Sequence, residues 1–206
     1  MFEQTFKTQL ASLTSDEQLV EQLWSEIKES YAASARHYHN LSHLDNLLAE
    51  LLPLREEIRD WQTLLFSIAY HDVIYNVLHS DNEEKSAKLA YERLAQLPVT
   101  PARRDKCFSQ IMATKKHGLA DDADTNLFTD ADLAILGTDS NTYHYYTQMI
   151  RKEYQIYPAL IYKPGRRKVL QHFLQMTHIY KTDFFRNKYE EQARANLDRE
   201  LQELLS

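Results

Sequence analysis

Leucines that recur at helical spacing constrain the fold of this chain more than any other feature. The longest run consists of Leu41, Leu44, Leu47, Leu48, Leu51 and Leu52. Residues three and four apart lie on one face of an α-helix, whereas a half-buried strand requires strict alternation. Pro53 ends the run, and no alternation of useful length occurs elsewhere in the sequence. The pattern predicts an all-α fold, a bundle of roughly eight to ten helices.

Length and composition indicate one ordinary globular domain. A chain of 206 residues is long enough for one well-packed core and short for two. Hydrophobic residues make up 43% and charged residues 26%, and only 3 Gly are present, too few for a fold of many tight turns. We therefore expect a single domain over residues 1–206. Its core would span about residues 36–140, with C-terminal helices of residues 140–205 packed on it.

Charge, cysteine content and hydropathy limit the partners and the compartment. The net charge is −6, which disfavours nonspecific binding of nucleic acid but not a small anionic substrate. Cys107 is the one cysteine, so no disulfide within the chain is expected, as suits a reducing cytoplasm. Cys107 itself is expected in the core. The N-terminus resembles no signal peptide and no apolar run reaches 18 residues, so a cytoplasmic protein without a membrane partner is expected.

The adjacent pair His71–Asp72 is the strongest indication of chemistry. It follows an apolar helical run from Trp61 to Ile68, in a helix expected from about Glu56, and precedes a polar loop at residues 79–84. An imidazole and a carboxylate at the end of a core helix both need partners when they are buried. A bound metal ion would satisfy both side chains at once, and it would require further ligands from other parts of the chain.

The other candidate ligands lie on two further elements. Together with the central pair they are His39, His43, His71, Asp72, Asp130 and Asp132. The two aspartates follow an expected acidic loop, residues 120–129, and adjoin an expected short helix, residues 131–136, that stops at Gly137. Two imidazoles and two carboxylates leave coordination positions open. Such a set suits a catalytic Mn²⁺, Fe, Co or Ni centre better than a closed structural zinc site, although Mg and Zn and one or two ions remain open.

The order H…HD…D resembles the HD superfamily of metal-dependent phosphohydrolases. The last aspartate stands in an Asp-Ala-Asp-Leu context that is similar to the Ala-Asp-Arg-Leu motif of some members. The resemblance implies an HD-type helical domain with His43, His71, Asp72 and Asp132 as metal ligands. It implies Asp72 as the bridging ligand if two ions bind, and it favours Asp132 over Asp130. The activity it implies is hydrolysis of phosphate esters or anhydrides by metal-bound hydroxide.

Further motifs extend this resemblance over roughly residues 36–200. In order they are YHNxxH, HDxxY, NExxSA, ATxxH, FxDADLAxLG and GRxxVL, which are similar to an uncharacterised bacterial branch of predicted HD phosphohydrolases. The YHNxxH segment also resembles cyclic-nucleotide phosphodiesterases, in which its first histidine donates a proton. That likeness implies His39 as the general acid for the leaving group. Asn76 stands where those enzymes have a histidine, which disfavours cyclic-nucleotide hydrolysis.

Several other residues have both a functional and a structural interpretation. His39 could equally be a hydrogen-bonded outer histidine. Glu83 could orient water or an outer ligand, or form a capping box with Ser80. His117 could bind a second metal or a phosphate, or act as a cation at a helix C-terminus.

A basic segment and a group of tyrosines also have both a functional and a structural interpretation. Arg166, just after the Pro164-Gly165 pair that is expected to open a helix, is our candidate for a phosphate clamp. The basic side chains around it are expected to form a solvated face. The tyrosines could stack a base or form core: Tyr143, Tyr145, Tyr146, Tyr154 and Tyr157.

Two classes of function follow from the sequence. The first is an enzyme that hydrolyses a small phosphorylated substrate, with a nucleotide favoured. The alternative is a metal- or nucleotide-binding regulatory module without catalysis. A nuclease is disfavoured by the acidic balance and the lack of a basic stripe. Apolar stripes on the terminal helices are compatible with a homodimer.

Overall fold

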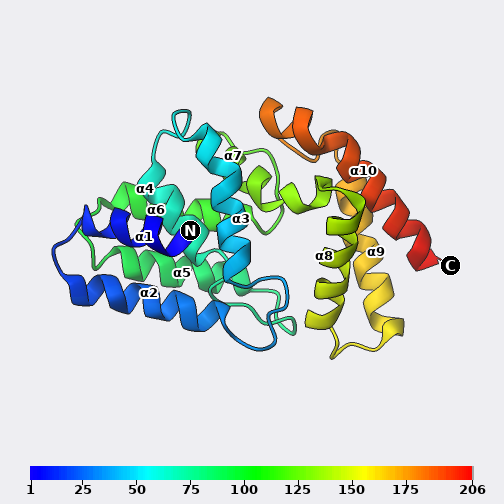
Figure 1. The fold of residues 1–206 in the computed structure, drawn as a ribbon, viewed down its shortest axis with the longest axis horizontal. Coiled ribbons are helices and arrows are strands. Elements are labelled where there is room, and N and C mark those ends of the chain that lie inside the picture. The colour runs from blue at the N-terminus through cyan, green and yellow to red at the C-terminus, as the bar shows by residue number, and fades with distance from the viewer. Residues whose placement is uncertain (206) are drawn as a thin grey trace. The chain divides into compact units, whose positions relative to one another are not determined.

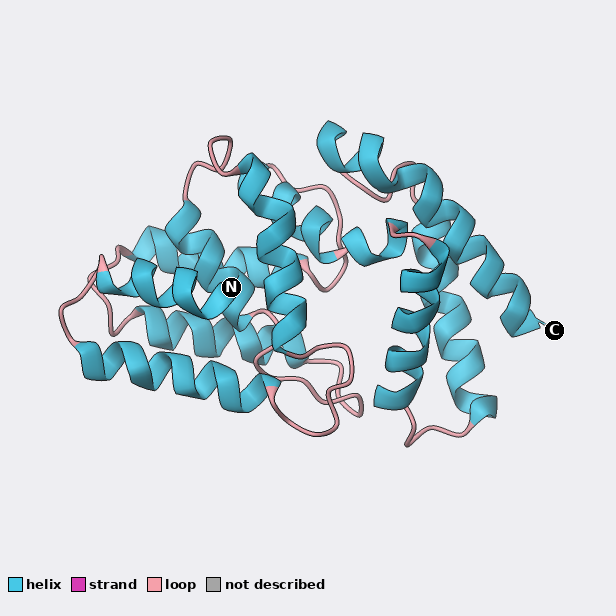
Figure 2. Cartoon of the chain, in the orientation of Figure 1, coloured by secondary structure: helices cyan, strands magenta, loops and turns pink. Residues whose placement is uncertain are grey.

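The computed structural model describes residues 1–205, and these residues form helices, turns and loops without a strand. Ten α-helices and two short 3₁₀ helices follow one another along the described chain (Figures 1 and 2). The predicted all-α class is therefore confirmed. The chain divides into two compact units, the first over Met1–Thr129 and the second beginning at Asp130. The expected single domain stays a prediction.

The first unit surrounds a central buried helix. Its elements are α1 (Phe2–Ala11), α2 (Glu17–Tyr31), α3 (Leu41–Leu51), η1 (Leu52–Leu54), α4 (Trp61–Tyr70), α5 (Asn82–Leu94) and α6 (Pro101–Ala113). Helix α4 contacts α1, α3, α5 and α6. Nine of its ten residues are buried, as expected for a helix that is apolar on every side.

Helix α4 begins five residues later than the sequence pattern predicted. The Asp60 side chain accepts hydrogen bonds from Thr63 N at 3.2 Å and from Thr63 Oγ1 at 2.8 Å. This cap satisfies amide groups that have no partner inside the helix. The expected start near Glu56 is therefore wrong, because it relied on apolar spacing and passed over the cap.

The expected acidic loop at residues 120–129 is also wrong, because α7 spans Ala123–Asp132. Asp122 caps this helix by accepting from Thr125 N at 3.0 Å. Asp124 is fully buried, and its carboxylate accepts from the backbone amides of Arg59 and Asp60 and from Lys106 Nζ, which lies 2.6 Å away. Asp122 is therefore a helix cap and Asp124 the buried half of an ion pair with Lys106, rather than parts of a loop.

The second unit contains three long helices. Its elements are η2 (Ala134–Gly137), α8 (Ser140–Glu153), α9 (Ala159–Gln175) and α10 (Asp183–Leu205), and α10 contacts both η2 and α9. Gly137 allows η2 to lie directly against α10, since a Cβ atom at this position would be 2.5 Å from Tyr189 Cβ. The expected helix over residues 131–136 is replaced by the end of α7 and the start of η2.

Helix α9 begins at Ala159, five residues before Pro164, where the sequence suggested its start. Pro158 precedes it, and its carbonyl accepts from Ile161 N at 2.9 Å and from Tyr162 N at 3.0 Å. Pro164 therefore lies inside the helix and has no N–H for the carbonyl of Leu160.

Within residues 1–205, none of the helices combines the length and apolar character that crossing a membrane would require.

Candidate metal centre

His71 is placed by the end of α4. Its backbone N–H still donates to Ser67 O at 2.9 Å, so the side chain projects from the last turn of the buried helix. The ring is only 1% exposed, and Nδ1 lies 2.8 Å from Ile68 O. A carbonyl oxygen can only accept, so Nδ1 carries the hydrogen. In the neutral ring, Nε2 is then unprotonated and carries a lone pair.

His43 is directed at the same point by α3. Asn40 caps α3 by accepting from Ser42 N at 2.9 Å, and this cap places His43 in the first turn of the helix. The His43 ring is 3% exposed, and its Nε2 lies 3.1 Å from Nε2 of His71. Two imidazole nitrogens from different helices therefore converge inside the first unit.

Asp72 supplies a carboxylate beside the His71 nitrogen. Its Oδ2 lies 3.2 Å from His71 Nε2, and its side chain is 17% exposed. A carboxylate oxygen and an imidazole lone pair are both acceptors and cannot bond to each other. A positive charge, either a proton or a metal ion, is therefore needed between them. Metal–ligand bonds of about 2.1 Å place neighbouring ligands of an octahedral ion roughly 3.0 Å apart, close to both observed spacings.

His39 lies on the more accessible side of Asp72. Its Nε2 is 3.9 Å from Asp72 Oδ2, within ion-pair range but too long for a hydrogen bond. The ring packs against Tyr75, with the ring centroids 4.5 Å apart, and 20% of the side chain is exposed. His39 is therefore held near the centre and remains accessible to solvent, as a proton donor to a substrate must be.

The two aspartates that end α7 have different roles. Asp132 is the last residue of α7, a helix that begins inside the first unit. Asp132 belongs to the second unit and stays a predicted ligand, as the sequence motif implied. Asp130 is fully buried, and its carboxylate accepts from Lys181 N at 2.9 Å and from Thr182 Oγ1 at 2.8 Å. Asp130 is already satisfied by these structural bonds, so Asp132 remains the predicted ligand of the two.

Arg36 is a residue of this region that the sequence analysis did not single out. Its Nη1 donates to Asp72 O at 2.6 Å and to His39 O at 3.3 Å, and its Nη2 donates to Val73 O at 2.9 Å. The guanidinium also lies 4.8 Å from the centre of the Tyr31 ring. Arg36 therefore joins the segment that carries His39 to the turn that carries Asp72. The two bonds to Asp72 O and Val73 O go to distant carbonyls, for which the sequence offers no local signal.

The remaining predicted residues lie on other elements. Glu83 is in the first turn of α5, with its carboxylate 3.9 Å from Lys115 Nζ, and the N-cap of α5 is Asp81 rather than Ser80. His117 follows α6 with a φ of 50°, so this histidine, and not Gly118, takes the left-handed position at the helix end. Neither arrangement tests the functional role that the sequence suggested.

Arg166 is buried in the second unit, where Glu200 engages it. Arg166 Nε lies 2.7 Å from Glu200 Oε1 and Nη2 lies 2.9 Å from Oε2, and Tyr143 Oη donates a short hydrogen bond to the same carboxylate. The Tyr146 ring lies beneath the guanidinium. Two of the nitrogens that a phosphate would need are therefore already bound. Tyr143 and Tyr146 are buried, whereas Tyr145 is exposed.

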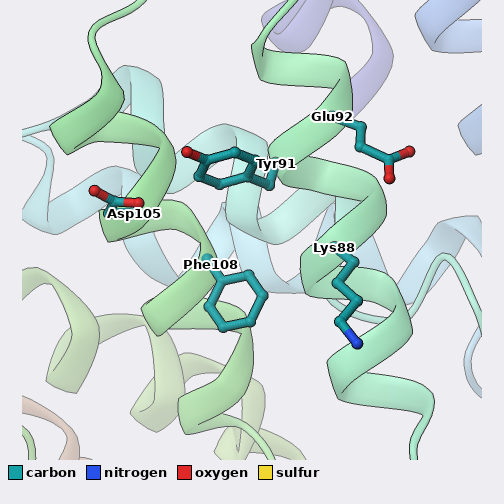
Figure 3. A pocket seen from close by; sticks show the side chains of 5 residues that line it. All are labelled: Lys88, Tyr91, Glu92, Asp105 and Phe108. Atoms are coloured by element: carbon teal, nitrogen blue, oxygen red, sulfur yellow. The ribbon is translucent and has the colours of Figure 1, made fainter.

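A surface pocket of about 360 Å³ lies elsewhere in the first unit, between α5 and α6. It is lined by Lys88, Tyr91, Glu92, Asp105 and Phe108 (Figure 3). The Tyr91 ring points from α5 towards α6, whereas Glu92 points away from it. None of the predicted site residues lines this pocket, so it is separate from the candidate metal centre.

Comparison with known proteins gives no independent assignment. Neither the protein-family models, nor the curated proteins, nor the solved structures include a match to this chain. Any functional assignment therefore depends on the residues of the candidate centre themselves.

Proposed function

We propose that this chain is a metal-dependent hydrolase of phosphate esters or anhydrides, of the HD type, acting on a small phosphorylated substrate such as a nucleotide. The convergence of His43 Nε2 and Asp72 Oδ2 on the buried Nε2 of His71, at 3.1 and 3.2 Å, carries the proposal. This spacing fits neighbouring ligands of a divalent ion. With Asp132, the donor set has two nitrogens and two carboxylates, as expected for a centre that keeps positions open.

Each protein group has a defined task in this proposal. His43, His71, Asp72 and Asp132 hold the ion, which in such sites activates water and polarises a phosphoryl oxygen. The bond from His71 Nδ1 to Ile68 O fixes the ring orientation and tautomer, as outer partners of metal-bound histidines do. His39 delivers a proton to the leaving oxygen, since it is partly exposed and lies beside Asp72. Arg36 keeps the His39 and Asp72 backbones together.

The single buried cysteine and the absence of any disulfide within the chain support a reducing compartment, and we propose the cytoplasm as the place of action.

Arg166 is not assigned a catalytic task, since Glu200 holds its guanidinium. Substrate charge would have to be balanced by the metal ion and by other cations.

The test combines metal analysis with turnover. Mass spectrometry of the purified protein should detect near-stoichiometric transition metal in the wild type and little in His71→Ala/Asp72→Ala. The matched control is His144→Ala, because His144 is exposed on α8 and lies outside the centre. A panel of nucleotides and phosphoesters with Mn²⁺ should then give turnover that Asp72→Ala abolishes.

Three results would decide between the alternatives. No metal in the wild type after soaking with Mn²⁺ or Fe²⁺ would refute the metal centre. Turnover that survives Asp72→Ala in the folded protein would refute its catalytic use. Bound metal with tight nucleotide binding but no product would favour the regulatory module.

A further inference from the structure

The connection between α8 and α9 exposes aliphatic side chains to solvent. Ile156 is 59% exposed, and in the first turn of α9 Leu160 is 89% and Ile161 59% exposed. We call residues 155–163 the α8–α9 tip; it joins the two helices in the yellow part of Figure 1. Isolated apolar residues are common on protein surfaces, but a group of three in one short segment marks an interaction site.

The periodicity of α9 explains why these side chains point outward. Tyr162, Arg166 and Leu170 recur every four residues and are half-buried or buried, so they form the inner face of the helix. Leu160 and Ile161 lie outside this inner face. Lys163, three residues after Leu160, is exposed on the side of Leu160, and Lys168, seven residues after Ile161, is exposed on the side of Ile161. With a rise of about 1.5 Å per residue, these cations follow Ile161 by roughly 3 and 10 Å.

The cations in and beside the tip have no acidic partners among the described residues. Lys152, Lys163, Arg167 and Lys168 form no ion pair with any residue that the structure describes. Two surface lysines of α5 are paired in contrast, since Lys85 lies 3.0 Å from Asp81 and Lys88 lies 2.6 Å from Glu84. A chain with a net charge of −6 therefore keeps a group of unneutralised positive charge next to exposed aliphatic side chains.

Tyrosines alternate with the aliphatic residues along this part of the chain. The Tyr154 ring lies 6.2 Å from that of Tyr157 and 6.1 Å from that of Tyr162, and Arg151 lies 4.6 Å from the Tyr162 ring centre. Tyrosine rings have an apolar body and a polar hydroxyl, and they are enriched where hydrocarbon meets lipid headgroups. Aliphatic, aromatic and cationic side chains thus follow one another along this part of the molecule.

We propose that the α8–α9 tip binds the surface of an anionic lipid bilayer, without crossing it. Ile156, Leu160 and Ile161 would enter the boundary between headgroups and acyl chains, while the lysines pair with lipid phosphates. Reversible attachment of this kind needs an apolar and a cationic contribution together, and the tip provides both. This proposal departs from the expectation from sequence, which was that the protein has no membrane partner.

A second copy of the chain is a less suitable occupant. A two-fold interface would place the tip against itself, because such interfaces use the same patch on both subunits. The lysines of one copy would then face the lysines of the other, and juxtaposed like charges oppose association. Anionic lipid offers the complementary charge.

Vesicle sedimentation tests the proposal without any catalytic measurement. The wild type should bind vesicles of phosphatidylcholine with about one-third phosphatidylglycerol, should not bind pure phosphatidylcholine, and should be released by NaCl. Leu160→Ser/Ile161→Ser should reduce the partition coefficient by at least about tenfold. Lys163→Gln/Lys168→Gln should reduce it by about 25-fold, since each basic residue near an anionic surface contributes on the order of a fivefold gain.

Matched variants separate this tip from general surface effects. Leu119→Ser removes an 81% exposed leucine that precedes acidic residues, and Lys85→Gln/Lys88→Gln removes two paired lysines. Both controls should leave vesicle binding unchanged, and circular dichroism should confirm that all variants are folded. No binding by the wild type at low salt, or binding that tip and control variants alter equally, would overturn the proposal. So would a dimer in solution that Leu160→Ser/Ile161→Ser converts to monomer while vesicle binding is absent.

Discussion

His43 Nε2 lies 3.1 Å from His71 Nε2, although the two residues come from different helices and both rings are almost completely buried. Buried polar atoms need partners, and two facing imidazole nitrogens can be satisfied only by a cation between them or by a hydrogen on one of them. Because His71 Nδ1 donates to Ile68 O, the neutral His71 ring offers only its lone pair to this space. The arrangement is well suited to binding a metal ion.

A metal ion should therefore stabilise the folded protein. Mn²⁺ should raise the thermal midpoint of the wild type, and His43→Ala should remove most of this rise. At one hundred times its dissociation constant, a ligand that binds only the folded state contributes about 2.7 kcal/mol. Differential scanning fluorimetry with and without EDTA measures the effect, with His144→Ala as the control. An equal rise in His43→Ala and the wild type would show that Mn²⁺ binds elsewhere.

Substitution of His39 should separate turnover from metal binding. His39 lies 3.9 Å from Asp72 Oδ2 and is not one of the proposed ligands. His39→Gln should keep the metal content of the wild type but reduce kcat by about 10²–10⁴-fold, the usual contribution of general acid catalysis. His37→Gln, in the same segment, should leave kcat unchanged. Metal loss in His39→Gln would instead identify His39 as a ligand.

Arg36 should matter through the backbone that it holds. Arg36→Lys keeps the charge but cannot reproduce donation from two guanidinium nitrogens to Asp72 O and Val73 O. The expected result is metal affinity lowered about 10–100-fold, as for other outer partners of metal ligands. Isothermal titration with Mn²⁺ measures it. Arg55→Lys, which alters an arginine over the Trp61 ring, is the control and should bind like the wild type.

The sequence was most informative where one local pattern determined the result. The leucines of residues 41–52 predicted a helix, and α3 occupies Leu41–Leu51. The His71–Asp72 pair was expected at the end of a core helix, and His71 is the C-cap of α4. Both predictions used only spacing and hydropathy, which act over a few turns of chain.

The sequence was less informative where distant residues decide the conformation. Asp124 was expected in an acidic loop, but its buried carboxylate pairs with Lys106 and accepts a hydrogen bond from the Arg59 amide. Pro164 suggested a helix start, but an additional turn precedes it. Arg36 acts on carbonyls 36 and 37 residues away. Such partners are unknown until the chain is folded, so local patterns cannot predict them.

Cys107 should be unreactive in the native protein. Burial raises the pKa of its thiol to about 12, so almost no thiolate exists at neutral pH. Ellman's reagent at pH 8 should modify it slowly before, and quickly after, unfolding in urea. Since the chain has only 1 cysteine, the signal has one source. Rapid modification of the native protein would show that Cys107 is accessible.

The same pKa implies a pH dependence of stability. The thiol of the unfolded chain ionises near its ordinary value of 9.0, whereas the folded protein retains the proton to about 12. The contribution to the free energy of unfolding is therefore complete below pH 9 and is lost as the pH rises towards 12. Cys107→Ala should show a smaller decline in stability over this range than the wild type, in urea denaturation at each pH.

Gly137 should be intolerant of any side chain. A Cβ atom there would lie 2.5 Å from Tyr189 Cβ and 2.6 Å from Tyr189 O, and the latter is backbone that cannot rotate away. Gly137→Ala should lower the free energy of unfolding by about 1–3 kcal/mol through overpacking of η2 against α10. Gly165→Ala is the matched control, since nothing lies within 4 Å of its Cβ position in α9. Alanine there should stabilise the helix by up to about 1 kcal/mol. Urea denaturation of both variants checks the contrast, and equal effects would mean that η2 and α10 are not in direct contact.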